Sequence, residues 1–136
     1  MEAYRRRVVR AWAGFDLAVT GLLVLPPVAR AFLGLLLEVN AFLGGAGPER
    51  LTALGLLFVC ITGALGVVWA AARLLRPTRV LGGIDAGARL WVGALIAWFV
   101  VTGGVPAIFL LFTVSEWAGG LHQGWTLLRP GSRARA

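Results

Sequence analysis

Residues 51–72 read LTALGLLFVCITGALGVVWAAA, a run that contains no charged side chain. A helix needs about 20 apolar residues to cross the hydrocarbon core of a bilayer, so this run is long enough by itself. The rest of the chain has the same character, because 59% of its 136 residues are hydrophobic and 14% are charged. A soluble domain carries about a quarter charged residues. The sequence therefore predicts an all-α membrane protein.

Proline and glycine divide the remaining apolar sequence into further segments. Pro26 and Pro27 end a first segment, and the TGGVP turn at residues 102–106 splits a long uncharged run into two. We expect a single four-helix transmembrane bundle over residues 1–128, followed by a disordered tail at 129–136. The predicted spans are about residues 8–25, 51–75, 86–101 and 105–128.

The stretch between the first two predicted spans, about residues 28–44, is neither a polar loop nor a full span. Large apolar residues recur there at helical spacing, while Arg30, Glu38 and Asn40 interrupt the pattern. We predict an amphipathic helix that lies at the outer interface or over the mouth of the bundle. Glu38 and Asn40 are candidates to line that mouth. The alternative interpretation is a solvated face of the helix.

Positive charges gather near the ends of the predicted spans. The net charge is +7, every basic residue is arginine, and clusters occur at 5–10, 73–79 and 129–135. This distribution is typical of topology signals and of contacts with anionic headgroups, and it excludes a single nucleic-acid footprint. Four spans place the three clusters on one side, which predicts cytoplasmic termini. The absence of lysine indicates GC-rich coding, and hence a bacterial inner membrane.

Glu116 lies near the middle of the last predicted span. A carboxylate in hydrocarbon is costly, so it needs a partner, a proton or a water-filled cavity. At about 1.5 Å of rise per residue, Glu116, His122, Asp16 and Arg89 all fall in the middle or the cytoplasmic half of their spans. These four, with Trp117 as a wall, are candidates for a ligand site or a proton relay. The alternative is structural: Asp16 pairs with Arg89 or Arg10, and Glu116 bonds across helices.

Other chemistry finds little support in the sequence. Cys60 is the only cysteine, which excludes an internal disulfide and a cysteine metal cluster. A metal site would need more ligands at matched spacing, so we predict none, and no cofactor is evident. Asp85 is expected to cap the third span after a turn at Gly82 and Gly83. Most tryptophans, including Trp12 and Trp69, are expected to form an aromatic belt at the membrane surface.

Two short motifs resemble a known group. The first span closes on GLLVLP at residues 21–26, and the last opens on GGVP at residues 103–106 and carries Glu116. With four predicted helices in so short a chain, this pattern is similar to the DoxX-like small bacterial membrane proteins. Most members of that group have no assigned activity, and for some the resemblance implies an accessory subunit of a quinone-linked oxidoreductase. A quinone or a lipid is a candidate ligand for this chain. The apolar stretch at 28–47 is longer than in that group.

Three functions are consistent with these features. The first is an accessory or structural subunit of a larger membrane redox or transport complex, which would have a membrane-protein partner or form a homo-oligomer in the lipid bilayer. The second is a small proton-coupled transporter that uses Glu116. The third is an intramembrane enzyme or binder of a lipid-like ligand, for which acid–base work by Glu116 and His122 would require both groups in one pocket.

Overall fold

The computed structural model describes residues 2–46 and 51–129, and this part of the chain is almost entirely helical. Within those residues it has five α-helices and a short 3-10 helix, and no strand. The elements are α1 (Glu2–Val24), α2 (Pro26–Phe42), α3 (Ala53–Leu75), α4 (Arg79–Val101), η1 (Ala107–Phe109) and α5 (Leu110–Leu128). The predicted all-α class is confirmed. The tail predicted at 129–136 lies, apart from Arg129, outside the described residues.

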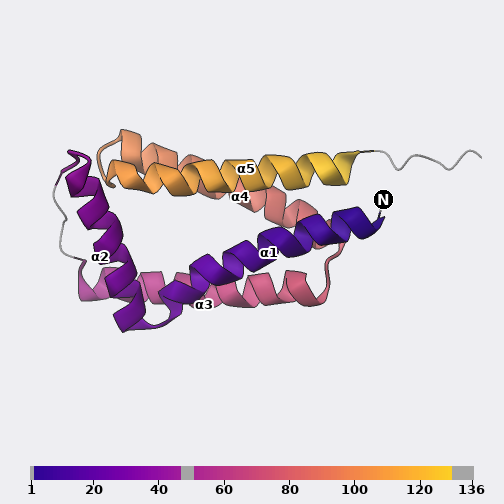
Figure 1. Cartoon of the computed structure of the whole chain (residues 1–136), viewed down its shortest axis with the longest axis horizontal. Coiled ribbons are helices and arrows are strands. Elements are labelled where there is room, and N and C mark those ends of the chain that lie inside the picture. The colour runs from indigo at the N-terminus through magenta and orange to yellow at the C-terminus, as the bar shows by residue number, and fades with distance from the viewer. Residues whose placement is uncertain (1, 47–50, 130–136) are drawn as a thin grey trace, which may run out of the picture.

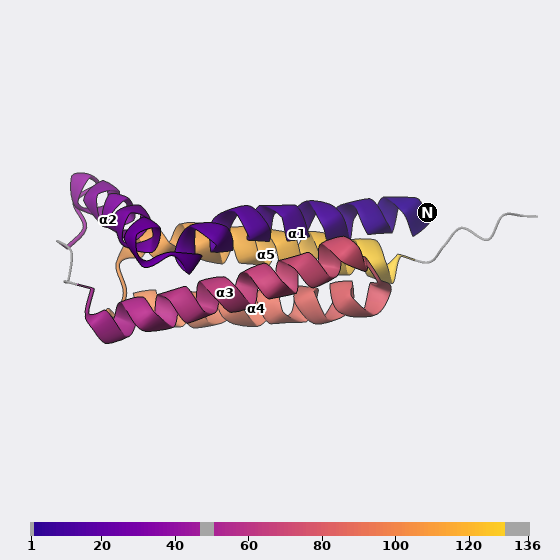
Figure 2. The same ribbon diagram turned by 90° about the horizontal axis from the view of Figure 1, so that it is seen from below.

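The long helices form two pairs, α1 with α3 and α4 with α5 (Figure 1). The start of α1, the connection between α3 and α4 and the end of α5 all lie at one end of the molecule, which is the arginine-rich end (Figures 1 and 2). Helix α2 stands across the opposite end, because the chain bends by 107° between α1 and α2. The two helix pairs lie closest to each other near the arginine-rich end, and α2 covers the opposite end of the molecule (Figure 1).

Small residues allow the helices of each pair to approach closely. A Cβ atom added at Gly63 of α3 would lie 2.7 Å from the backbone carbonyl carbon of Leu23 in α1. One added at Gly120 of α5 would lie 2.9 Å from the carbonyl oxygen of Ala86 in α4. Both distances are shorter than real Cβ contacts, so a larger residue would push the helices apart. Close backbone approach of this kind drives helix association in lipid.

The helix ends follow from local signals in the sequence. Pro26 occupies the first position of α2, where its missing N–H costs nothing, so the proline pair that ends α1 also begins α2. The helix predicted at 28–44 is thus present at Pro26–Phe42. The hydroxyl of Thr52 accepts a 3.0 Å bond from the Gly55 N–H and caps α3. The predicted turn at 102–106 is confirmed by Gly103, whose φ of +81° favours glycine.

The predicted start of the third span is wrong. Thr78 caps α4 by accepting a bond from the Leu81 N–H, so this helix begins at Arg79 rather than near residue 86. Gly82 is therefore helical and not part of a turn. A Cβ there would lie 2.9 Å from Val9 of α1, so close packing explains the glycine. Asp85 is consequently no cap, because it lies in the second turn of α4 and is buried.

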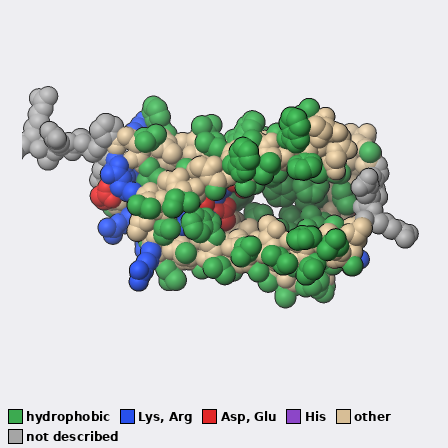
Figure 3. Space-filling view, turned by 180° about the vertical axis from the view of Figure 1, so that it is seen from behind, with side chains coloured by type: hydrophobic (Ala, Val, Ile, Leu, Met, Phe, Trp, Pro, Cys, Tyr) green, Lys and Arg blue, Asp and Glu red, His purple; other side chains and the backbone are tan. Residues whose placement is uncertain are grey.

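Polar and apolar side chains are distributed in the opposite way from a water-soluble protein. The largest fully buried side chains are Arg73, Gln123 and Val9. Large hydrophobic residues instead cover the outside of the helices, while basic side chains gather at one end (Figure 3). Helices α3 and α4 are each long and apolar enough to cross a membrane, and α1 with α2 would add a third crossing if that bent pair is one span. Two or three crossings are compatible with a membrane protein, and four stay a prediction.

Candidate functional site

Five charged side chains meet between the two helix pairs and form what we name the charge cluster. All four long helices contribute to it. Its members are Asp16 of α1, Arg73 of α3, Asp85 and Arg89 of α4, and Glu116 of α5. Asp85 and Arg89 are four residues apart, so they lie on the same face of α4. The cluster thus ties the α1–α3 pair to the α4–α5 pair through buried ions.

Arg89 joins three helices through its guanidinium group. Its Nη1 donates to Glu116 Oε2 at 3.2 Å, its Nε donates to Asp85 Oδ2 at 3.0 Å, and its Nη2 bonds to Asp16 Oδ2. The guanidinium carbon also lies 5.2 Å from the centre of the Trp12 ring, which is within cation–π range. Because one planar fork serves carboxylates on α1, α4 and α5, Arg89 fixes the relative positions of these helices.

Arg73 and Asp85 form the most buried part of the cluster. Arg73 is 0% exposed, and its Nη1 donates to Asp85 Oδ2 at 2.6 Å while its Nη2 bonds to Asp16. Asp85 also accepts a 2.7 Å bond from Trp69 Nε1 and a 3.0 Å bond from Gln123 Nε2. Buried charges are tolerated when they are paired and hydrogen-bonded in this way. This part of the cluster is a structural anchor.

The other two carboxylates are less enclosed. The side chains of Asp16 and Glu116 are 15% and 22% exposed, compared with 4% for Asp85. Among the described residues, no protein donor contacts the second oxygen of either group, Asp16 Oδ1 or Glu116 Oε1. Three carboxylates face two guanidinium groups, so the fully ionised cluster has one negative charge in excess. The two carboxylates that keep a free acceptor oxygen are also the two most exposed members of the cluster.

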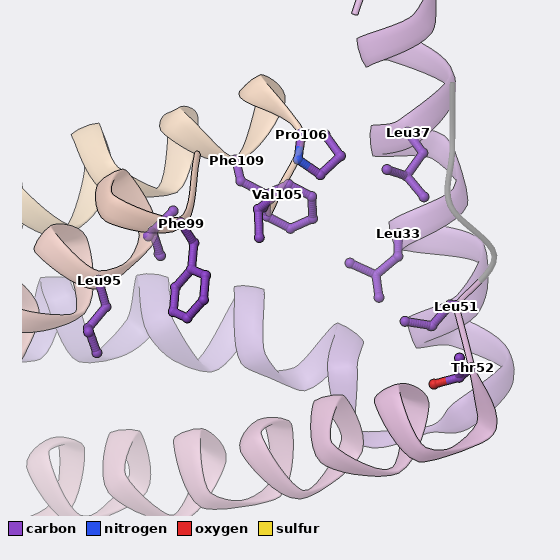
Figure 4. Close-up of a pocket in the computed structure, with 10 residues that line it drawn as sticks. Leu33, Leu37, Leu51, Thr52, Leu95, Phe99, Val105, Pro106 and Phe109 are labelled. Atoms are coloured by element: carbon purple, nitrogen blue, oxygen red, sulfur yellow. The ribbon is translucent and has the colours of Figure 1, made fainter. Parts of the chain in front are cut away.

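An apolar cavity of about 510 Å³ lies at the α2 end of the molecule. Leu33 and Leu37 of α2 face Phe99 of α4 and Phe109 of η1 across it (Figure 4). Thr52, the polar member of the wall, already accepts a bond from Gly55. The space-filling view shows a hollow between the two halves of the molecule, with acidic side chains near its edge (Figure 3).

The charge cluster lies on the arginine-rich side of this cavity. Helix α4 runs from the arginine-rich end toward α2, and Leu95 of the cavity wall follows Arg89 by six residues. Helix α5 runs the other way, and Phe109 precedes Glu116 by seven residues. Both separations correspond to about 10 Å along a helix. An apolar cavity and a negatively charged edge are therefore about 10 Å apart along the bundle axis.

The structure brings together three of the five predicted inner-site residues. Asp16, Arg89 and Glu116 share the cluster, whereas His122 is exposed and accepts a 3.2 Å bond from Trp12 Nε1. Trp117 packs over Gly93 and donates to the Leu90 carbonyl at 3.2 Å, on the outside of the α4–α5 pair. No bond joins Glu116 and His122 within the described residues.

The two residues predicted to line the outer mouth, Glu38 and Asn40, differ in their burial. Glu38 is exposed on α2. Asn40 is buried, donates to the Ala46 carbonyl at 3.0 Å and accepts a 3.2 Å bond from the Ile108 N–H. Asn40 therefore attaches the end of α2 to η1, and it also lines a cavity of about 460 Å³ between these two elements.

Sequence reasoning missed Arg73 and Asp85, two of the five members of the cluster, and the two tryptophans that contact it. Arg73 was assigned to a surface arginine group and Asp85 to a helix cap, whereas Trp12 and Trp69 were assigned to an aromatic belt. One usable signal was the spacing of Asp85 and Arg89, an i, i+4 pair of opposite charge in an otherwise uncharged helical stretch. Residues 2–46 and 51–129 hold no group of three His, Cys, Asp or Glu side chains that could bind a metal ion.

Comparison of the chain with models of protein families, with curated proteins and with solved structures found no match. The arguments for function therefore rest on the cluster, the cavity and the surface of this chain.

Proposed function

We propose that this protein is a four-span integral membrane protein that binds an amphipathic, positively charged molecule between its two helix pairs. The ligand's cationic head would lie against Asp16 and Glu116, and its apolar part would extend toward the cavity beneath α2. The observation that carries this proposal is that the cluster has three carboxylates for two guanidinium groups, and that its two partly exposed carboxylates, Asp16 and Glu116, each keep one oxygen without a donor among the described residues.

The lengths of α1 and α5 support the four-span arrangement. Their 23 and 19 residues correspond to about 34 and 28 Å, close to the thickness of the hydrocarbon core. Phe15 and Leu22 of α1, like Leu121 and Trp125 of α5, are exposed large hydrophobic residues. Asp16 and Glu116 of the same helices point instead into the charge cluster. Both ends of the described chain and the α3–α4 connection carry arginine, and by the positive-inside rule this supports a cytoplasmic location for this end. In a bacterial inner membrane, α2 would then lie at the outer interface.

The hydrogen-bonding atoms that are free at the cluster favour a cation over a quinone as the ligand. Quinone carbonyls accept hydrogen bonds, so they need donors. The donors of Arg89 are directed at the three carboxylates, and only the Nε atom of Arg73 has no partner among the described residues. The atoms left free at the open edge are carboxylate oxygens, which accept bonds and attract positive charge. Desolvated carboxylates of this kind mark binding sites in membrane proteins.

The cavity suits the apolar part of such a ligand. Its volume of about 510 Å³ is within the range of small-molecule sites, about 300–1,000 Å³. A molecule with about 10 Å between its charge and its apolar group would reach both regions.

Binding of a primary alkylammonium compound, whose N–H groups can donate to Asp16 and Glu116, to the purified protein in lipid nanodiscs tests the proposal. We expect tighter binding than for an alkyl sulfonate of equal chain length, and about tenfold weaker binding in Glu116→Gln, because a charge-assisted bond contributes about 1.5–3 kcal/mol. Glu38→Gln is the matched control, since it removes an equal charge from an exposed position on α2. Equal binding of the cation and the sulfonate, or an unchanged affinity in Glu116→Gln, would refute the proposal.

Proton-coupled transport is the second candidate, because a proton could neutralise the same excess carboxylate. In liposomes, Glu116→Gln should then abolish substrate-driven proton movement, and an unchanged flux would exclude this function. Binding without transport would leave the cation-binding proposal intact.

The accessory-subunit hypothesis stays a prediction. Gly83 and Gly87 lie four residues apart on α4 with open space around them, so a partner helix could approach there. Co-purification from the native membrane tests this hypothesis, and a chain that isolates without a partner would count against it. The hypothesis of an intramembrane enzyme, or of a binder of a lipid-like ligand, also stays a prediction; among the described residues Glu116 bonds to Arg89 and His122 to Trp12.

A further inference from the structure

A second cavity lies at the arginine-rich end, far from α2, between the first turns of α1 and the connection from α3 to α4. Its volume is about 580 Å³. Two arginines from each side line it: Arg6 and Arg10 from α1, and Arg76 and Arg79 from the connection and the start of α4. All four are exposed. Basic side chains are gathered at this end of the molecule in Figure 3.

The local charge favours an anion. The acidic residue in this wall is Glu2, which is already paired with Arg5 at 2.7 Å. The bond from Arg5 lowers the pKa of Glu2, and the nearby positive charges of Arg79 and Arg6 lower it further. Glu2 is therefore ionised and engaged near neutral pH, and four arginines remain around the cavity. A guanidinium group matches the geometry of phosphate oxygens and can bind them in a bidentate manner.

The cavity also has an apolar edge. Leu75, at the end of α3, forms part of the wall and is 80% exposed. Val80, the second residue of α4, is not part of the wall but follows the wall residue Arg79 and is 71% exposed. Both residues belong to helices that are long and apolar enough to cross a membrane, so this edge lies where headgroups meet acyl chains. A free phosphate would leave these apolar side chains without a partner, whereas a phospholipid would cover them.

We propose that this cavity binds the phosphate of an anionic phospholipid, with Arg6, Arg10, Arg76 and Arg79 around the headgroup and an acyl chain along Leu75. The proposal requires α3 and α4 to lie in a bilayer. It does not depend on what binds at the charge cluster, because the two sites share no residue.

Native mass spectrometry of the delipidated protein tests the lipid site with phosphatidylglycerol, phosphatidylcholine and inorganic phosphate as probes. We expect phosphatidylglycerol to bind more tightly than phosphatidylcholine. In the double variant Arg10→Gln with Arg76→Gln, the ratio of the affinity for phosphatidylglycerol to that for phosphatidylcholine should fall about tenfold, as expected for two arginines near a headgroup. The control double variant, Arg30→Gln with Arg129→Gln, removes the same charge at exposed positions outside the cavity and should keep the preference.

Three other outcomes of this experiment would overturn the proposal. Equal binding of the two lipids, or an equal loss in the control variant, would overturn the proposal, because binding would then reflect net charge alone. Displacement of phosphatidylglycerol by millimolar phosphate would identify the site as one for free phosphate and would also overturn the lipid assignment. Circular dichroism shows whether both double variants keep their helix content. If the pocket variant fails to fold, the single variants Arg10→Gln and Arg76→Gln repeat the comparison.

Discussion

The charge cluster makes a quantitative prediction about Arg89. The substitution Arg89→Met removes the guanidinium that contacts Asp16, Asp85 and Glu116, while it keeps an unbranched side chain in its place. Three carboxylates then face Arg73 alone, so the excess negative charge of the ionised cluster doubles. Because Arg89 is only 3% exposed, water cannot replace the lost partner without a change in helix packing.

The expected cost follows from how the three carboxylates are held. Removal of one partner from a buried ion pair costs about 3–5 kcal/mol. Asp85 keeps its bonds to Arg73, Trp69 and Gln123, so it stays satisfied. Asp16 and Glu116 are partly exposed and regain some solvation. We therefore expect Arg89→Met to lower the free energy of unfolding by about 3 kcal/mol, at the lower end of that range.

The companion substitution Glu116→Gln has the opposite effect on charge. It removes the excess carboxylate and leaves two negative groups against two guanidinium groups, so the free energy of unfolding should be unchanged or higher. In the double variant, the excess charge returns to its original value. Glu116→Gln should thus recover about 1–2 kcal/mol of the loss caused by Arg89→Met, an interaction energy within the usual range for residues in contact.

Equilibrium unfolding in mixed micelles with increasing dodecyl sulfate measures these free energies, with the fluorescence of the six tryptophans as the signal. Glu38→Gln controls for loss of a carboxylate at an exposed position. If Glu116→Gln destabilises the protein as much as Arg89→Met does, or if the two effects simply add, the charge count in the cluster is wrong.

Two further predictions concern packing and the α2 connection. Gly63→Ala should cost about 1–3 kcal/mol in the same unfolding assay, because its Cβ would collide with the backbone of Leu23. Gly87→Ala, which has open space, should be neutral or stabilise by up to about 1 kcal/mol through helix propensity, and an equal loss in both would contradict the packing argument. Asn40→Ala should cost about 1–3 kcal/mol and speed amide hydrogen exchange at Ile108, which loses its buried acceptor; unchanged exchange there would contradict this role.

Some elements could be predicted from the sequence because their signals are local. The span expected at 51–75 is observed as Ala53–Leu75, and the helix expected at 28–44 is observed as Pro26–Phe42. Run length, proline position and turn glycines act within a few residues, so they can be read without knowledge of the fold. The start of α4 was mispredicted because Gly82 and Gly83 resemble a turn. The glycine at 82 instead serves contact with α1, which is distant in sequence.

Composition and apolar run length, read from the sequence alone, determined that this chain is helical and has a membrane-like surface. They also marked Asp16, Arg89 and Glu116 as costly in hydrocarbon. Only the tertiary structure decided which partner each charge has, and that Arg73 and Asp85 belong with them. The physical reason is that hydropathy sums over residues along the chain. Ion pairing depends instead on the rotation and depth of each helix, which are set by close packing between helices that are far apart in sequence.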